Sequence, residues 1–204
     1  MNYLSKFSND RQISFFGFNF LEHAYTYFTS SKKQSRNLVA LTHACNAILL
    51  NGTNIFFGYD SNLYNVATIW STGYFLYDTY FMLRFEKLDI MRFAYLYHHM
   101  ASIYIIHHNP TQYYGDQILF WGELSNIPSY FVYYYLHTKY KNENKIKMWS
   151  NIQKWIYAGI RLPVLGYIAV KSIQNSPTMG PVKAAIPVYL MGLIWTYKLF
   201  NAKN

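Results

Sequence analysis

Cysteine is nearly absent from this chain of 204 residues, in which Cys45 is the single example. One thiol excludes an internal disulfide and any metal site built from several thiolates. Charged residues are also scarce, at 13% of the chain, where soluble domains usually carry about 25%. Motifs with a known chemistry are missing as well: the chain has no glycine-rich phosphate loop, no Gly-x-Ser-x-Gly elbow and no His-Glu-x-x-His pair.

Apolar and aromatic residues take the place of charge, at 52% and 21% of the chain, and 22 residues are tyrosine. The mean hydropathy is only −0.05. Tyrosine scores as polar on that scale, although it suits membrane interfaces and helix contacts. The net charge is +9, but the Lys and Arg residues are dispersed in short groups between apolar segments. A nucleic-acid-binding protein should gather its Lys and Arg residues on one face, so no nucleic-acid partner is expected.

Six apolar runs of 14 to 22 residues recur along the chain, and His107 and His108 extend the shortest. Roughly 20 residues cross a membrane. The runs are Asn37–Phe57, Val66–Leu83, Phe93–Ile106, Ile118–Leu136, Trp149–Val170 and Ala184–Phe200. An earlier run, Ile13–Phe28, falls short of the spanning length at 16 residues and holds Glu22 and His23, so it is either an interfacial helix or a weak extra span. We predict an all-α, multi-pass transmembrane bundle of six spans, or seven with this run. Residues 1–34 would form a polar N-terminus plus that helix, and 35–204 the transmembrane domain.

The segments between these runs alternate in charge. Three are basic and three have few or no bases; the basic ones are 32–36, 84–92 and 139–147, and the others are 58–65, 109–116 and 172–182. Basic loops stay on the cytoplasmic side of a membrane, and a soluble bundle has no reason to alternate in this way. The pattern therefore predicts an integral membrane protein whose C-terminus is cytoplasmic. Pro128, Pro163 and Pro187 lie inside predicted spans and indicate kinks.

Ionisable residues lie at one depth in three successive runs. His43, Asp78 and the pair His98-His99 are each about two turns, or roughly 9 Å, from the basic end of their run. Each isolated charge in a membrane costs about 2.5–3.5 kcal/mol, so they predict an inward-facing polar cluster. His43 could also be a neutral hydrogen-bonding residue, and adjacent histidines point about 100° apart, so only one of the pair need face a cavity.

Two further ionisable residues lie in later runs. Arg161 falls near the midplane of its span, where we expect a structural ion pair, and Asp78 could pair with Arg161 or with a histidine. Glu123 falls past the midplane, unless Pro128 bends it inward. His107 and His108 lie at the non-cytoplasmic end, where we expect no functional role.

A metal site has little support in the spacing. His98 and His99 cannot both bind one ion from a single helix, because ligands on one face are three or four residues apart. A metal site assembled from His43, Asp78 and His98 on three helices is the remaining option. No metal or cofactor is expected.

An ordered set of residues resembles the TLC domain family, which includes ceramide synthases, translocon-associated membrane proteins and lipid-regulating proteins. The matching segments are Thr42-His43-Ala44, Ser71-Thr72-Gly73-Tyr74-Phe75-Leu76-Tyr77-Asp78, Tyr97-His98-His99, Gly122-Glu123-Leu124-Ser125-Asn126-Ile127-Pro128, Arg161 and Trp195. They cover roughly residues 35–200 and are similar to the branch that does not contain the ceramide synthases. The resemblance implies six or more helices around a lipid-accessible cavity, in the endoplasmic reticulum rather than the plasma membrane.

The chain departs from the ceramide synthases at two acidic positions. Where those enzymes carry His-Asp and a further Asp after the histidine pair, this chain has Gly122-Glu123 and Asn126. One carboxylate is kept as glutamate and the other is replaced by an amide, which argues against ceramide synthesis. The cluster expected around the cavity consists of His43, Asp78, Ser125, Asn126 and Arg161.

Three functions follow from the resemblance. The first is a membrane protein that binds or senses lipid acyl chains and influences membrane lipid composition. The second is an acyltransferase that takes acyl-CoA as substrate, with His98 or His99 as general base and Glu123 or Asp78 holding its tautomer. The third is a cargo receptor or translocon-associated scaffold. Membrane lipids are the expected partners in the first two, and the sequence identifies no protein partner.

Overall fold

The computed structural model describes residues 3–29, 31–108, 112–138, 141–175 and 179–201, and these form helices with no strand among them. The predicted all-helical architecture is therefore confirmed. The helices are α1 (Tyr3–Thr26), α2 (Lys32–Phe57), α3 (Ser61–Phe85), α4 (Ile90–His108), α5 (Gln112–His137), α6 (Glu143–Arg161), α7 (Pro163–Asn175) and α8 (Met179–Asn201).

The apolar runs fall on these helices with two differences. α1 begins at Tyr3, well before the apolar run that starts at Ile13. The run Trp149–Val170 is divided between α6 and α7, because the helix is interrupted at Leu162, just before Pro163. Proline has no N–H to donate and is readily placed at the first position of a helix. Pro128 and Pro187, by contrast, lie inside α5 and α8.

Short polar side chains fix where several helices begin. The Ser31 hydroxyl accepts from the Gln34 N–H at 3.2 Å, and the Asn142 side chain accepts from the Lys145 N–H at 3.0 Å. Each satisfies a backbone donor that the first helical turn leaves free. At the end of α2, Gly58 has φ +114°, a conformation that side chains with a Cβ rarely adopt. α2 therefore stops there, and the chain turns back into α3.

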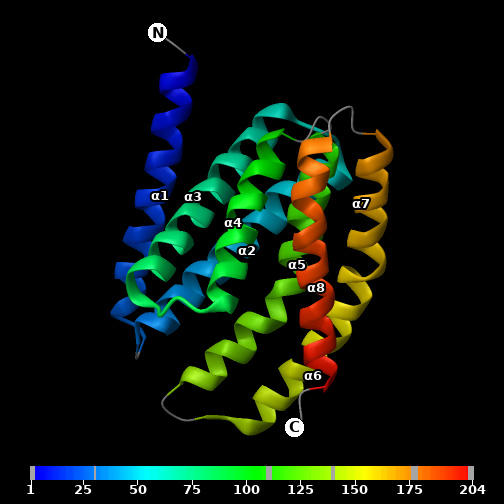
Figure 1. The fold of residues 1–204 in the computed structure, drawn as a ribbon. Helices are drawn as coiled ribbons and strands as arrows, with labels where there is room; N and C mark the ends of the chain where they lie inside the picture. The colour runs from blue at the N-terminus through cyan, green and yellow to red at the C-terminus, as the bar shows by residue number, and fades with distance from the viewer. Residues whose placement is uncertain (1–2, 30, 109–111, 139–140, 176–178, 202–204) are drawn as a thin grey trace.

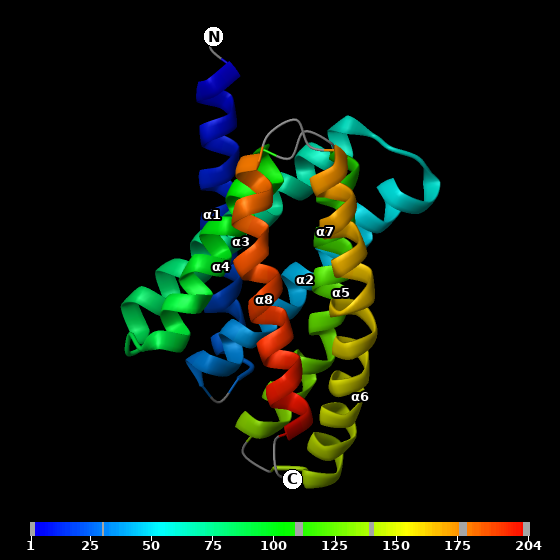
Figure 2. The ribbon, with the colours of Figure 1, turned by 45° about the vertical axis from the view of Figure 1, so that its right-hand side comes forward.

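The helices pack side by side as an antiparallel bundle (Figures 1 and 2). α2 packs most extensively against α5, α1 against α3, and α4 against α8. The starts of α2, α4 and α6 and the ends of α3, α5 and α8 lie at the same end of the bundle in both views. This is the end that the basic segments predict to be cytoplasmic. The apolar core is formed mainly by side chains of α1, α2 and α3, including Phe18, Val39, Tyr77 and Phe81.

α1 is held tightly against α3. At Gly73 of α3, an added Cβ would collide with the Ser14 side chain of α1, so only glycine permits this approach. Phe18 of α1 is completely buried and packs on Trp70, with ring centroids 4.4 Å apart. The boundary at residue 34 falls in the first turn of α2, and α1 shares one core with the helices that follow.

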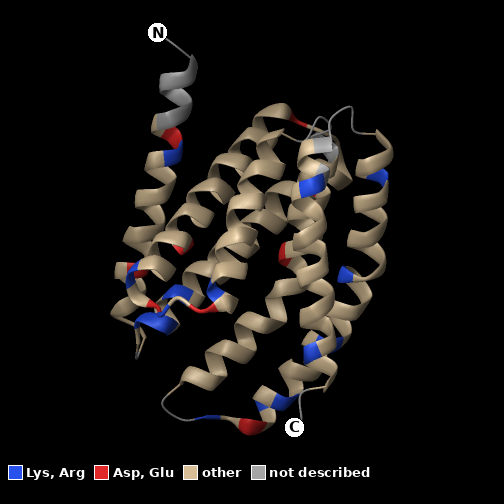
Figure 3. Ribbon diagram, in the orientation of Figure 1, with Lys and Arg blue, Asp and Glu red and all other residues tan. Residues whose placement is uncertain are grey.

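By length and composition, one helical segment among the described residues qualifies as able to cross a membrane. It is Glu143–Asn175, which has 33 residues and a mean hydropathy of 1.3 in its most apolar window. The outer faces of α1, α2 and α6 carry large apolar side chains: Phe20 is 73% exposed, Leu49 66% and Trp155 71%. Charged residues are sparse along the middle of most helices (Figure 3).

Candidate functional site

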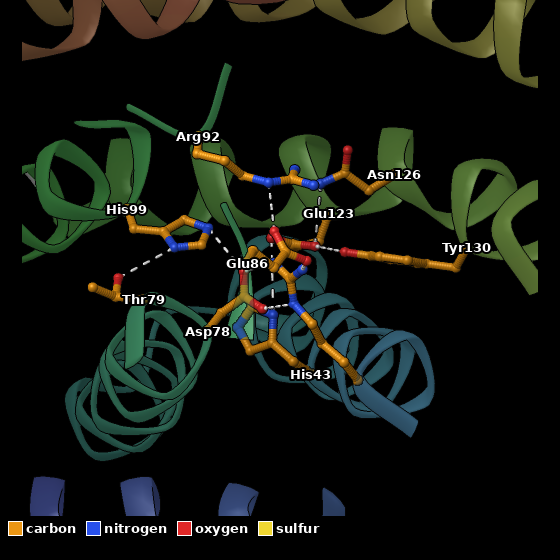
Figure 4. A network of polar contacts seen from close by, with 10 residues as sticks. His43, Asp78, Thr79, Glu86, Arg92, His99, Glu123, Asn126 and Tyr130 are labelled. Atoms are coloured by element: carbon orange, nitrogen blue, oxygen red, sulfur yellow. Dashed lines mark hydrogen bonds and ion pairs between the residues drawn. The ribbon is translucent and has the colours of Figure 1, made fainter. Parts of the chain in front are cut away.

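Three helices bring ionisable side chains together at one level of the bundle. His43 of α2, Asp78 of α3 and His99 of α4 are all buried. His99 Nε2 lies 3.5 Å from Asp78 Oδ2 (Figure 4). The His43 ring stacks on the Tyr74 ring, with centroids 4.0 Å apart. His43 Nε2 lies 3.2 Å from the Ser71 hydroxyl. The shared depth in the sequence thus corresponds to a cluster in space.

An arginine not among the expected site residues holds Asp78. Arg36 Nε and Nη2 donate to the two Asp78 carboxylate oxygens at 2.5 and 2.8 Å, which is a bidentate ion pair. Arg36 Nη1 also donates to Glu86 at 2.7 Å, and Arg92 Nε lies 2.5 Å from the second Glu86 oxygen. In the sequence, Arg36 and Arg92 are read only as basic residues of the segments between apolar runs. In the structure they connect the cluster to the end of the bundle where α2 and α4 begin.

Two spacings carry a signal for these arginines. Arg36 precedes His43 by seven residues, and Arg92 precedes His99 by the same interval. Residues seven apart lie on one face of a helix. Each arginine therefore shares the inward face of its helix with a histidine of the cluster, which loop charge alone does not reveal.

Glu123 joins the cluster from α5. Its Oε1 lies 3.9 Å from His43 Nδ1, and its Oε2 accepts from Tyr130 at 3.3 Å and from Asn126 at 3.4 Å. The depth estimate that places Glu123 beyond the midplane therefore does not separate it from the histidines. Its histidine neighbour is His43. Asp78, not Glu123, contacts the histidine pair.

The expected ion pair of Arg161 is absent from the described residues. Arg161 Nε donates to the Ser125 hydroxyl at 3.1 Å, and Nη2 donates to the side-chain amide oxygen of Asn126 at 2.7 Å. Both acceptors are neutral. Tyr157 donates to the same Asn126 oxygen at 2.9 Å. Asp78 pairs instead with Arg36, through both carboxylate oxygens.

The two adjacent histidines have different surroundings, as their 100° separation on a helix requires. His99 contacts Asp78 through Nε2 and lies 3.4 Å from the Thr79 hydroxyl through Nδ1. His98 Nδ1 is buried and has no hydrogen-bond partner among the described residues. The His98 ring meets Trp195 of α8 edge-on, with centroids 6.4 Å apart. His99 is therefore held in place, whereas His98 is free to contact a ligand.

Two adjacent cavities lie beside these residues. The first has a volume of about 480 Å³ and the more polar lining of the two, which includes Lys33, Arg92 and Lys198. The second has a volume of about 440 Å³ and has a mainly apolar lining; examples are Leu165, Val170, Ile173, Ile186 and Val188. Five residues line both cavities: Phe75, His98, Glu123, Asn126 and Arg161. A polar and an apolar compartment thus meet at the candidate site.

Metal binding finds no support in this arrangement: among the described residues, no three His, Cys, Asp or Glu side chains are placed to hold an ion.

His107 also has a contact that its sequence position does not indicate. Its Nε2 lies 2.9 Å from the Thr72 hydroxyl and its Nδ1 lies 3.3 Å from Arg11 Nη2, which ties α4 to α3 and α1.

A second buried carboxyl lies at the opposite end of the bundle. Asp116, in the first turns of α5 and before the predicted span, is 1% exposed. Asn54 of α2 donates to it at 3.2 Å. Burial raises the pKa of Asp116 to about 6, while the Asn54 hydrogen bond partly offsets that rise.

The fold and the site define a helical bundle with a buried ionisable cluster and two adjacent cavities that share His98, Glu123 and Arg161. The chain matches no protein-family model, no curated protein and no solved structure. The resemblance to the TLC domain family therefore stays a prediction from the residues themselves.

Proposed function

We propose that this protein is a multi-pass membrane protein of the TLC type that binds a lipid acyl chain and influences membrane lipid composition. The observation that carries the proposal is the apolar cavity of about 440 Å³, which adjoins the polar cluster at His98, Glu123 and Arg161. A pocket with a long apolar lining and a few convergent polar groups suits an amphiphile, because each end meets matching chemistry.

The membrane setting is supported by the outer surface. Exposed Phe20, Leu49 and Trp155 would be an aggregation hazard in water but suit contact with lipid. The basic helix ends lie together, at the end that also holds the C-terminus (Figure 3). Six spans with a cytoplasmic C-terminus satisfy both features, and an endoplasmic reticulum location follows from the resemblance.

Two neighbouring alanines of α8 provide a matched test. Ala185 lines the apolar cavity and Ala184 does not. Ala185→Phe should fill the cavity, whereas Ala184→Phe adds the same bulk outside it. Lipidomics of cells that lack the protein and are complemented with each variant should show the wild-type lipid profile for Ala184→Phe and the null profile for Ala185→Phe. No change in any lipid class between null and wild-type cells would argue against the proposal.

An acyltransferase is the second candidate, and the unpartnered His98 Nδ1 favours it. His98 borders both cavities, so a thioester whose chain lay in the apolar cavity would have its carbonyl beside this ring. As general base, His98 would take the proton of an attacking amine or hydroxyl, and the thiolate of CoA would leave. His99, fixed by Asp78, would position its neighbour and take no proton.

Release of CoA tests this second candidate. Purified protein given acyl-CoA and a long-chain base should release CoA, His98→Ala should abolish the release, and His99→Ala should reduce it. Turnover that persists unchanged in the double variant would remove the acyltransferase candidate and leave the binding proposal intact.

A further inference from the structure

Arg161 is a buried guanidinium that has no carboxylate within ion-pair distance among the described residues. It is only 7% exposed, and its hydrogen bonds go to the neutral Ser125 hydroxyl and Asn126 carbonyl. The side-chain amide nitrogen of Asn126 donates to Glu123, which forms no ion pair with Arg161. A buried cation without a counter-ion is costly, more so at membrane depth. The guanidinium therefore has no negative charge in direct contact, and Glu123 acts on it only at longer range.

The structure leaves room for a negative charge beside the guanidinium. Gly192 of α8 faces Arg161, and an added Cβ would lie 3.6 Å from Nη1 and 3.7 Å from Cδ, which is ordinary contact. Nη1 has no hydrogen bond of its own among the described residues, since the bonds of Arg161 use Nε and Nη2. Arg161 and Gly192 both line the apolar cavity, so this edge of the guanidinium is accessible from it.

The apolar cavity has the depth of one lipid chain. It runs along α8 from Gly192 to Pro181, about 16 Å at 1.5 Å per residue. A chain in one leaflet spans about half of the roughly 30 Å hydrocarbon core.

We infer that the ligand is a long-chain carboxylate, a free fatty acid, whose head group pairs with Arg161 and whose chain lies along α8 toward Pro181. This inference rests on the proposed function, because it needs the chain in the apolar cavity. One carboxylate balances one guanidinium, and the planar fork of arginine matches its two oxygens. A phosphate monoester carries about −1.5 to −2 charges and would leave negative charge buried in excess.

Thermal unfolding of the purified full-length protein in detergent at neutral pH tests the inference, with palmitate, cetyl alcohol and methyl palmitate as probes. All three carry the same chain, and only palmitate is charged. We expect palmitate to raise the melting temperature by about 5–10 °C at a hundred times its Kd. The two uncharged probes should give clearly smaller shifts, from the chain alone.

Four variants separate the charge from the chain. Arg161→Gln should lose the preference for palmitate and keep the response to cetyl alcohol, and without ligand it should melt no lower than wild type. Arg161→Lys should keep part of the preference. Gly192→Ala should bind palmitate as wild type does, whereas Gly192→Val should block the carboxylate site.

Each outcome of the melting experiment is decisive. Equal shifts with palmitate and cetyl alcohol in the wild type, or a palmitate preference that survives Arg161→Gln, would overturn the inference and leave chain binding standing. Absence of any shift with all three probes would overturn the proposed function as well.

Discussion

Arg36 and Asp78 form a bidentate ion pair between α2 and α3, with distances of 2.5 and 2.8 Å. Asp78 is almost fully buried, and the same carboxylate lies 3.5 Å from His99. The pair links the end of the bundle where α2 begins to the cluster. Arg36, which the sequence analysis counts only as a positive charge of a loop, is thus a structural partner of the candidate site.

Removing the arginine should leave the Asp78 carboxylate buried with His99 as its remaining partner. We expect Arg36→Met to lower the free energy of unfolding by about 3–5 kcal/mol, the usual cost of breaking a buried pair. The double variant Arg36→Met, Asp78→Asn should recover part of that loss. Thermal unfolding in detergent measures both. Lys33→Met, an exposed position with the same change in charge, is the control and should change stability by about 0.5 kcal/mol or less.

The close approach of α1 to α3 depends on Gly73. Gly73→Ala gains about 1 kcal/mol of helix propensity but places a Cβ against Ser14, and we expect a net loss of about 1–3 kcal/mol. Gly159 of α6 has nothing within 4 Å of an added Cβ, so Gly159→Ala should be neutral or stabilising. Melting temperatures of the two variants compare the same chemical change. Equal behaviour would show that α1 does not pack on α3 through this contact.

Much of the fold and part of the site are readable from the sequence, for identifiable reasons. Apolar runs define where helices lie, and the level of His43, Asp78 and His99 follows from counting turns inward from basic ends. Side-chain partners are different, because they depend on how helices rotate about their axes. The ion pair expected for Arg161 is not found among the described residues for this reason, and Asp78 pairs instead with Arg36.

The two histidines should differ in what they contribute to stability. His99 contacts Asp78 and Thr79, so His99→Ala should cost about 1–3 kcal/mol by leaving buried groups unsatisfied. His98 Nδ1 has no partner among the described residues, so His98→Ala should cost clearly less. Unfolding of the two variants under identical conditions gives the comparison. A larger loss from His98→Ala would contradict the division of roles between them.

Asp116 should make stability depend on pH. Its pKa rises to about 6 in the folded protein, above the value near 4 of an unfolded chain. The protonated carboxyl therefore favours the folded state, and this contribution is full below about pH 4 and lost as pH rises through about 6. Asp116→Asn should remove this component and raise the melting temperature at neutral pH by about 2–4 °C, the shift that about 1 kcal/mol produces. Melting curves between acidic and neutral pH provide the measurement, and an unchanged pH profile in the variant would contradict the assignment.

Native mass spectrometry of the protein purified from membranes tests the central claim, an acyl chain in the apolar cavity, most directly. Wild type and Ala184→Phe should each retain one bound lipid, and Ala185→Phe, which fills the cavity, should retain none while keeping its helical content. Lipid retained equally by Ala185→Phe, or no retained lipid in the wild type, would contradict the account.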